Sequence, residues 1–249
     1  MKKLNKESIE TLFDRLSDKF KNPKSELDFN NNFELLCAVM LSAQTTDKAV
    51  NSVTPSLFKI APNAKAMSLL DTQVIENCIK RLGLYKNKAL NLKKMSNELV
   101  TRFNGLVPDN YDDLVSLPGV GSKTAKVVLN VGFKQNTLAV DTHIFRVCNR
   151  TGLCIGKTVK DVEKNVVLKV PKDHLYNAHH YLLLHGRYVC TARKPDCENC
   201  CIKDICKKNL DWYLKFQFIS IRCFSKIKKL CWLDNLFDFL IIGLCLFGT

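Results

Sequence analysis

Four cysteines late in the chain constrain its fold more than any other feature. They lie within seventeen residues in the pattern C-x6-C-x2-C-x5-C, at Cys190, Cys197, Cys200 and Cys206. Four thiolates this close together can converge on one centre, and tetrahedral sulfur ligation suits either zinc or an iron–sulfur cluster. A single tight C-x2-C pair is less typical of zinc, which usually takes two close pairs, but the spacing alone leaves both metals open.

The remaining cysteines are interpreted from the expected cellular compartment. Residues Met1–Glu7 are basic and no apolar stretch follows them, so no secretory signal is predicted and a cytoplasmic location is expected. A reducing cytoplasm disfavours a disulfide framework for the twelve cysteines and favours a metal or cluster at the clustered ones. Cys201 is expected to point away from the centre, and Cys37, Cys78 and Cys148 are expected in apolar helix cores.

Apolar residues recur with helical spacing along almost the whole chain, and no two-residue alternation lasts long enough to predict a sheet. The sequence therefore predicts an all-α fold. The expected helices are Ile9–Phe20, Phe33–Ala43 with Asn32 as its cap, Val74–Leu82, Lys88–Phe103, Lys123–Phe133, Thr142–Arg150, Val159–Leu168 and Leu175–Gly186.

Charge points to the class of partner. The chain has 38 Lys and Arg against 24 Asp and Glu, which gives a net charge of +14 and a pI near 9.2. Such a surplus favours polyanions, with nucleic acid ahead of membrane lipid, although a merely soluble basic protein has the same composition. The apolar run Phe239–Phe247 is far shorter than the roughly 20 residues that a membrane span needs, so no membrane partner is expected.

A glycine-containing turn lies between two helical segments, in the sequence Leu117–Lys123 (LPGVGSK). Gly119 and Gly121 flank one apolar residue, which allows positive φ and a close approach of the backbone to a ligand. The N–H groups of the turn and of the next helix form an anion site that fits a phosphate. A plain connector between two helices is the alternative.

Lys123 begins the helix after this turn, and Asp141 follows in the segment AVDTH. A lysine amine can attack a sugar C1′ carbon and form a Schiff base. A carboxylate opposite it would stabilise the cationic sugar and assist proton transfers. Taken singly, a surface cation for Lys123 and a helix N-cap for Asp141 are the simpler interpretations.

The turn Leu117–Lys123, the segment that contains Asp141 and the four-cysteine pattern occur together, and in this order, in the endonuclease III family. The chain resembles this family from about residue 7 to residue 208. The segments Leu41–Asp47, Gly83–Tyr85 and Leu184–Arg187 also look like family motifs. The resemblance implies a helix-hairpin-helix fold and a bifunctional enzyme of base excision repair. Such an enzyme removes oxidised pyrimidines of the thymine glycol class and cleaves the abasic site by β-elimination through a lysine Schiff base.

The resemblance also implies roles for single residues. Lys123 would be the nucleophile and Asp141 its acidic partner, with Gln44 and Leu84 as wedge residues that fill the stack. The four clustered cysteines would hold a [4Fe–4S] cluster. Further DNA contacts are expected at Gly119, Gly121, His143, Arg146, Arg193 and Lys194.

Arg193 and Lys194 lie between the first two clustered cysteines. A loop pinned by a cluster can present such cations rigidly to phosphates, and a solvated loop with scattered charge is the alternative. The expected partner is damaged double-stranded DNA, bound by a monomer associated with the bacterial nucleoid in the cytoplasm.

The expected domains are residues 1–24, a helix that packs with the cluster domain; 25–136, a six-helix domain with the helix-hairpin-helix at about 111–133; 137–208, the cluster domain with its loop at 190–206; and 209–249, a tail that resembles nothing in the family. Two rival functions share some of these features. A monofunctional adenine mismatch glycosylase lacks the nucleophilic lysine, and a non-catalytic iron–sulfur module needs neither Lys123 nor Asp141.

His179, His180 and His185 are expected to serve helix packing and hydrogen bonding rather than zinc.

Overall fold

Helices account for all regular structure in residues 1–209, the part of the chain that the computed structural model describes, and no strand occurs there. The all-α prediction is therefore confirmed. Met1–Lys208 form one unit and Asn209–Thr249 a second. Over the described residues, no helix has the length and apolar character that crossing a membrane requires. The apolar run Phe239–Phe247 and most of the tail lie outside the described residues.

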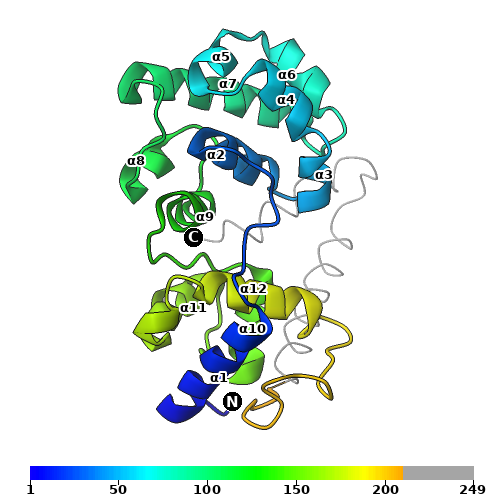
Figure 1. Cartoon of the computed structure of the whole chain (residues 1–249), viewed down its shortest axis with the longest axis vertical. Helices are drawn as coiled ribbons and strands as arrows, with labels where there is room; N and C mark the ends of the chain where they lie inside the picture. The colour runs from blue at the N-terminus through cyan, green and yellow to red at the C-terminus, as the bar shows by residue number, and fades with distance from the viewer. Residues whose placement is uncertain (210–249) are drawn as a thin grey trace, which may run out of the picture. The chain divides into compact units, whose positions relative to one another are not determined.

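One group of helices surrounds α2 (Asn32–Leu41), in which every side chain except that of Asn32 is buried. Its other members are α3 (Asp47–Asn51), α4 (Thr54–Ile60), α5 (Ala64–Leu69), α6 (Thr72–Ile79), α7 (Tyr85–Phe103), α8 (Tyr111–Ser116) and α9 (Ser122–Phe133). Helix α2 packs on α7 and α9, while α5 and α6 pack on α7 (Figure 1). The buried side chains between Leu27 and Leu129 form the core of this group.

The group contains eight helices where six were expected in residues 25–136. Four of the eight, α3, α4, α5 and α8, do not correspond to any helix range expected from the sequence; they are short, and local signals begin them. Thr46 caps α3 and Asn63 caps α5 through side-chain oxygens, and a proline lies at the start of α4. Helices of five to seven residues show too little periodicity to be recognised from apolar spacing alone.

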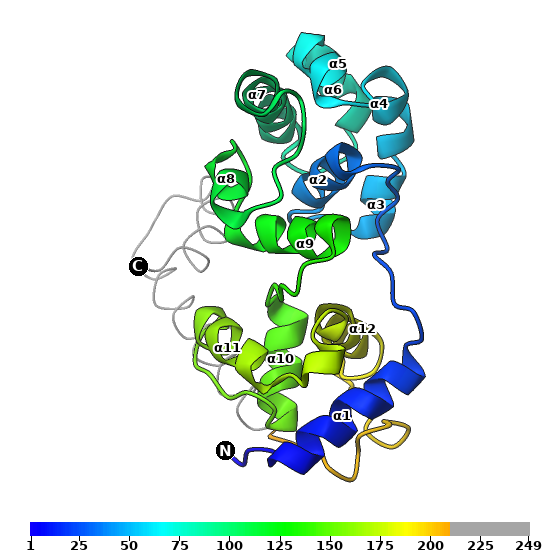
Figure 2. The same cartoon turned by 60° about the vertical axis from the view of Figure 1, so that its left-hand side comes forward.

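A second group combines the N-terminal helix with those that follow α9. It consists of α1 (Lys6–Lys19), α10 (Thr142–Thr151), α11 (Val159–Val166), the 3-10 turns Val167–Lys169 and Lys172–His174, and α12 (Ala178–Tyr188). Helix α10 packs on α11 and α12, and α1 packs on α12 (Figure 2). Arg15 of α1 donates hydrogen bonds to the Cys201 carbonyl at 3.0 Å and to Asp204 at 2.5 Å. The N-terminal helix therefore lies against the loop that carries the clustered cysteines.

Two segments join the groups: residues 20–31 lead from α1 to α2, and residues 134–141 lead from α9 to α10 (Figure 2). The chain thus passes twice between the groups, and each passage brings polar side chains to their junction. The domain limits named above remain predictions.

Some expected boundaries shift by a few residues. Asn31, not Asn32, caps α2, because its side-chain oxygen accepts a hydrogen bond from the Glu34 amide at 2.9 Å. Helix α6 (Thr72–Ile79) begins and ends a few residues earlier than the expected Val74–Leu82. Helix α12 begins at Ala178, after a 3-10 turn. Cys37 and Cys148 are buried as expected, whereas Cys78 is only half-buried.

Candidate active site and cluster loop

The turn between α8 and α9 requires glycine at position 119 for two reasons. Gly119 has φ +78°, which L side chains rarely adopt, and a Cβ there would lie 2.9 Å from both Asn91 Cβ and Met40 Cε. The turn is therefore packed closely against α2 and α7. At the next glycine, Gly121, no side chain caps the start of α9. The first amides of α9 remain available to an anionic ligand.

Lys123, the second residue of α9, faces Asp141 across the junction of the two groups. Lys123 Nζ lies 3.8 Å from Asp141 Oδ2; the lysine side chain is 60% exposed and the aspartate side chain 10%. Asp141 Oδ1 accepts a hydrogen bond from the Ile144 amide at 2.8 Å and caps α10. The two interpretations of Asp141 are therefore compatible, because one oxygen caps a helix while the other faces the amine.

A cavity of about 190 Å³ opens beside this pair. Its walls come from α9, the cap of α10, the loop between α2 and α3, α12, and residues 24–27 of the first connecting segment. The polar side chains that line it include those of Glu26, Gln44, Asp47, Lys123, Asp141 and Arg187. Residues far apart in sequence thus form one polar cavity around the expected nucleophile.

His179 of α12 also lines the cavity. Its Nδ1 donates a hydrogen bond to the Ala139 carbonyl at 3.0 Å. Burial lowers the pKa of His179 to about 3, so the ring is neutral at neutral pH. Because Nδ1 carries the proton, Nε2 keeps its lone pair. His180 is also buried, and its ring lies edge to face with the His179 ring, with the two ring centroids 5.3 Å apart.

The burial of His179 predicts a stability loss on acidification. The unfolded chain gains a proton at this residue near pH 6.5, whereas the folded protein gains it only near pH 3. The free energy of unfolding should therefore fall as pH decreases below 6.5, by up to about 2 kcal/mol from His179 at pH 5. His180, whose pKa burial also lowers, adds to this fall.

Urea denaturation between pH 5.0 and 7.5 measures this slope. His179→Asn keeps a side-chain N–H for the Ala139 carbonyl but cannot titrate. The slope of its free energy of unfolding against pH should therefore be smaller than that of the wild type by about one proton. Equal slopes for the wild type and the variant would show that His179 is protonated in the folded protein.

Gln44 and Leu84, the expected wedge residues, lie near each other. Both line a second cavity of about 180 Å³ together with Gly119. Both are exposed and have positive φ, 56° for Gln44 and 58° for Leu84. Non-glycine residues in this region cost energy and concentrate at functional sites. Three of the expected DNA contacts, Gln44, Leu84 and Gly119, therefore line the same cavity.

Lys88 of α7 is a structural residue that sequence reasoning missed. Its buried amine donates hydrogen bonds to the Leu41 carbonyl at 2.9 Å and to Thr45 Oγ1 at 2.6 Å. Burial lowers the pKa of Lys88. These bonds attach the loop that carries Gln44 to the helix that follows Leu84. In the sequence, Lys88 is one of 38 basic residues, and no signal distinguishes it.

The four clustered cysteines lie in the loop after α12, and all are half-buried. Burial raises the pKa of the Cys206 thiol, and the nearby thiols of Cys190, Cys197 and Cys200 raise it further. Within the described residues, no three Cys, His, Asp or Glu side chains converge closely enough to hold a single metal ion. A donor set of four neighbouring thiols fits a [4Fe–4S] cluster, in which each cysteine binds a different iron.

Three further residues lie in this loop or contact it. Hydrogen bonding to Cys200 lowers the pKa of Cys201 to about 6, and the nearby charges of Lys19 and Arg15 of α1 lower it further. His185 is buried, and its Nε2 lies 3.9 Å from Cys200 Sγ. Arg150 of α10 binds the backbone carbonyls of Thr191 at 2.6 Å and Ala192 at 2.7 Å, and so holds the start of the loop.

The expected DNA contact at Arg146 is wrong. Its side chain lies inside the protein, with only 4% of the residue exposed. The guanidinium donates to the carbonyls of Cys190 at 2.9 Å and Gly186 at 2.7 Å, so it fixes the end of α12 and the loop. His143 is half-buried next to it, with Nδ1 3.2 Å from the guanidinium. Arg193 and Lys194 are exposed.

Comparison with known proteins gives two family matches. Residues 37–172 match the HhH-GPD superfamily of base excision DNA repair proteins. Residues 190–206, bounded by the first and last clustered cysteines, match the iron–sulfur binding domain of endonuclease III.

Individual relatives agree with these matches. The chain is 48% identical to endonuclease III of Buchnera aphidicola subsp. Acyrthosiphon pisum and 47% identical to that of Escherichia coli K12. Each alignment covers 82% of this chain and 97% of the relative. A solved structure of a trapped endonuclease III–DNA covalent intermediate superposes with a TM-score of 0.77 at 40% identity. That superposition covers 82% of this chain and 97% of the other.

Proposed function

Because this chain belongs to the endonuclease III family, we propose that Lys123 is the nucleophile with which it attacks DNA and that Asp141 is the acidic partner. The chain is a DNA glycosylase and abasic-site lyase of base excision repair that acts on oxidised pyrimidines, and its cofactor is a [4Fe–4S] cluster. The assignment of roles to single residues is our proposal.

One observation carries this assignment: Lys123 Nζ and Asp141 Oδ2 are 3.8 Å apart at the edge of a polar cavity. The amine attacks C1′ of the damaged nucleotide, and the C1′–N bond breaks as its electron pair leaves with the base. Loss of a proton from the new ammonium and opening of the sugar give an imine. Removal of a C2′ proton then expels the 3′ phosphate, which is the β-elimination that nicks the strand. The Asp141 carboxylate stabilises the cationic sugar.

The proposed substrate is damaged double-stranded DNA. A base inside a duplex is out of reach, so the damaged nucleotide must be extruded into the cavity at a cost of a few kcal/mol. Gln44 and Leu84 fill the vacated stack, since both are exposed beside the glycine turn. Gly119, Gly121 and the start of α9 bind the phosphate backbone through amide N–H groups.

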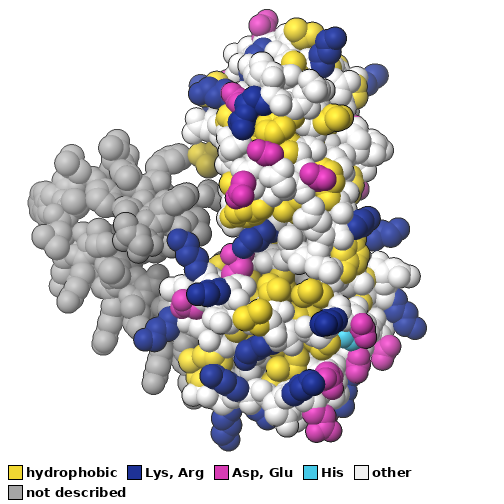
Figure 3. All heavy atoms as spheres, turned by 90° about the vertical axis from the view of Figure 1, so that its left-hand side faces the viewer, with side chains coloured by type: hydrophobic (Ala, Val, Ile, Leu, Met, Phe, Trp, Pro, Cys, Tyr) yellow, Lys and Arg dark blue, Asp and Glu magenta, His cyan; other side chains and the backbone are white. Residues whose placement is uncertain are grey.

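Cations supply the remaining backbone contacts. Arg193 and Lys194 are exposed on the cluster loop, and His143 is a further proposed contact at the start of α10. On the face drawn in Figure 3, lysine and arginine side chains lie on both groups of helices. We propose that the protein acts as a monomer, because one chain provides both sides of the cavity, and that it works at the nucleoid.

Cys190, Cys197, Cys200 and Cys206 are the proposed ligands of the [4Fe–4S] cluster. When bound, the cluster ties the loop to the end of α12 through four iron–thiolate bonds. The chain itself already holds this loop with Arg146 and Arg150, whose side chains bind the carbonyls of Cys190, Thr191 and Ala192.

A nicking assay tests the proposed function. Duplex DNA with one thymine glycol should be cut without alkali, whereas undamaged duplex should stay intact and the single-stranded lesion should react more slowly. Base release with strand cleavage only after alkali would indicate a monofunctional glycosylase. Binding with neither event would indicate a non-catalytic DNA-binding module.

A further inference from the structure

A buried lysine lines the same cavity as Gln44 and Leu84, and the proposed chemistry does not use it. Lys88 of α7 is only 9% exposed. Burial alone lowers the pKa of its amine, and no carboxylate in residues 1–209 offsets the cost of burying this charge. An apolar side chain of similar length would fill the space at a lower cost. What the amine adds is the pair of hydrogen bonds that it donates.

The side chain of Lys88 holds the loop between α2 and α3 on both sides of Gln44. Its Nζ donates a hydrogen bond to the carbonyl of Leu41, the last residue of α2, at 2.9 Å. The last carbonyls of a helix lack partners within it, and the helix dipole favours a cation there. Nζ donates a second bond to Thr45 Oγ1 at 2.6 Å. One amine therefore binds the loop before and after Gln44.

The backbone of the same residue fixes Leu84. The Lys88 amide donates a hydrogen bond to the Leu84 carbonyl at 3.0 Å, in the first turn of α7. No side chain caps this end of the helix. Lys88 thus contacts both segments that bring an exposed side chain to the cavity: its amide binds Leu84, and its amine binds the loop of Gln44.

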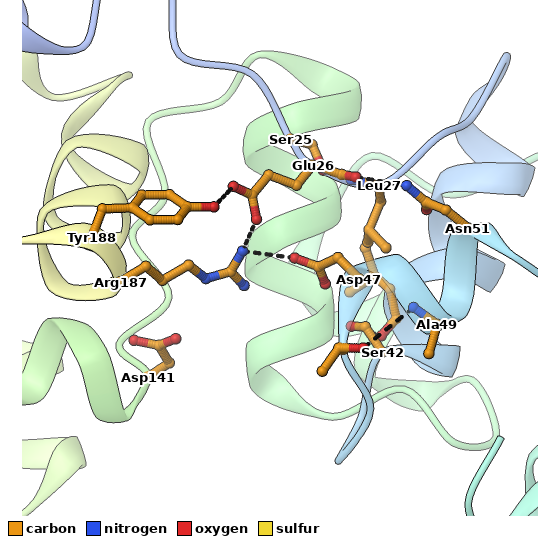
Figure 4. Close-up of polar contacts among 12 residues, drawn as sticks. Ser25, Glu26, Leu27, Ser42, Asp47, Ala49, Asn51, Asp141, Arg187 and Tyr188 are labelled. Carbon is orange, nitrogen blue, oxygen red and sulfur yellow. Dashed lines mark hydrogen bonds and ion pairs between the residues drawn. The ribbon is translucent and has the colours of Figure 1, made fainter. Parts of the chain in front are cut away.

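The far end of the Gln44 loop is held independently. Asp47, the first residue of α3, pairs with Arg187 of α12 at 2.8 Å (Figure 4). The other hydrogen bonds of residues 42–46 that the structure describes stay within residues 38–50. Among these described bonds, the one from Lys88 is the only one that ties residues 42–46 to another part of the fold.

The backbone conformation of both exposed residues explains why this tie matters. Gln44 and Leu84 have positive φ, which costs a non-glycine residue energy and persists only where the surroundings hold it. We propose that Lys88 is a positioning residue that fixes Gln44 relative to Leu84, so that both side chains enter the base stack as one preformed wedge. The inference rests on the proposed function, which assigns these two residues to the vacated stack.

This role determines which step depends on Lys88. Extrusion from a duplex requires side chains that replace the stacking of the lost base, whereas a base in a single strand is already unpaired. A wedge that is ordered before binding loses no affinity to the ordering of its loop. Removal of the Lys88 amine should therefore slow extrusion of a paired lesion and leave the covalent chemistry at Lys123 unchanged.

Lys88→Met tests this role, because it keeps the length of the side chain and removes its donors. Single-turnover base excision is measured on a thymine glycol duplex and on the lesion strand alone. On the duplex we expect the rate to fall about 10- to 100-fold, the scale of a lost hydrogen bond that involves a charged group. On the single strand the rate should remain close to wild type. Fluorescence of a 2-aminopurine beside the lesion reports unstacking directly and should show slower extrusion.

A second pair of variants tests the acceptor, and a third supplies the control. Thr45→Val keeps the shape of the side chain but removes the oxygen that Lys88 binds, so it should show a smaller loss on the duplex alone. Thr45→Ser keeps that oxygen and should resemble wild type. Lys93→Met is the matched control, because the amine of Lys93 on the same helix binds the carbonyl of Leu70 after α5 instead. Thermal unfolding and the visible absorbance of the cluster verify that each variant is folded and loaded.

A double variant shows whether Lys88 acts through Gln44. Residues that act through one another have non-additive effects. Gln44→Ala should itself slow excision from the duplex, and Lys88→Met should add little to that loss when the two changes are combined.

Three results would overturn the proposal. Equal losses on duplex and single strand would mean that Lys88 only stabilises the fold. Excision from the duplex at the wild-type rate would mean that the loop keeps its conformation without the amine. Additive losses in the double variant would mean that Lys88 does not act through Gln44. Failure of the proposed function has a different signature, because the wild type itself would then cut neither substrate.

Discussion

Lys123→Gln should eliminate covalent capture of the protein on abasic DNA. Glutamine keeps a polar side chain of similar length at an exposed position, so folding, cluster content and lesion binding should survive. Without the amine no imine can form, and borohydride trapping should fall to background. Gel analysis of trapped complexes, with lesion binding measured in parallel, checks this expectation.

Lys126→Gln is the matched control for this variant. Lys126 lies on the same helix, one turn further along, and its amine pairs with Glu163 at 2.6 Å rather than with Asp141. Trapping should remain near wild type in this variant. Efficient trapping of Lys123→Gln would mean that another amine attacks the sugar.

Asp141→Asn should have the second largest effect on catalysis. Its loss of activity should be partial, whereas Lys123→Gln should abolish covalent capture. The amide keeps an oxygen that can accept from the Ile144 amide, so the cap of α10 should survive. The variant loses the negative charge that faces Lys123 and the developing cation. Single-turnover excision should fall by roughly 10²–10⁴, the usual scale for a lost acid–base or electrostatic group. Slow trapping should persist because Lys123 remains.

Asp141→Ala separates the two roles of this carboxylate. It removes the cap as well as the charge, and so should lower stability by about 1 kcal/mol relative to Asp141→Asn. If Asp141→Asn excised at the wild-type rate, the carboxylate would be only a helix cap.

The sequence predicted the elements that are long or that carry a motif. Helix α7 spans 19 residues and was recognised from periodicity, and Lys123 and Asp141 were identified from motifs in a known order. Short helices such as α3 and α5 were missed because caps, not apolar spacing, define them. Periodicity reports which face of a helix is buried, and five or six residues sample that face too little.

Polar residues inside the fold were the main source of error. Arg146 was assigned to DNA because a cation beside a motif suggests a phosphate contact, whereas its partners are carbonyls some 40 residues later in the chain. Lys88 and the ion pairs that Arg187 makes with Asp47 and Glu26 were not found for the same reason. Their partners lie far away in sequence, and a single sequence does not reveal such pairs.

The site of the covalent bond is the most direct test of the account. The wild-type protein is incubated with abasic duplex and borohydride, digested, and analysed by mass spectrometry to locate the residue that carries the reduced sugar. We expect a single modified residue, Lys123, in the peptide that begins α9. Modification of a different lysine or of the N-terminal amine, with Lys123 intact, would contradict it.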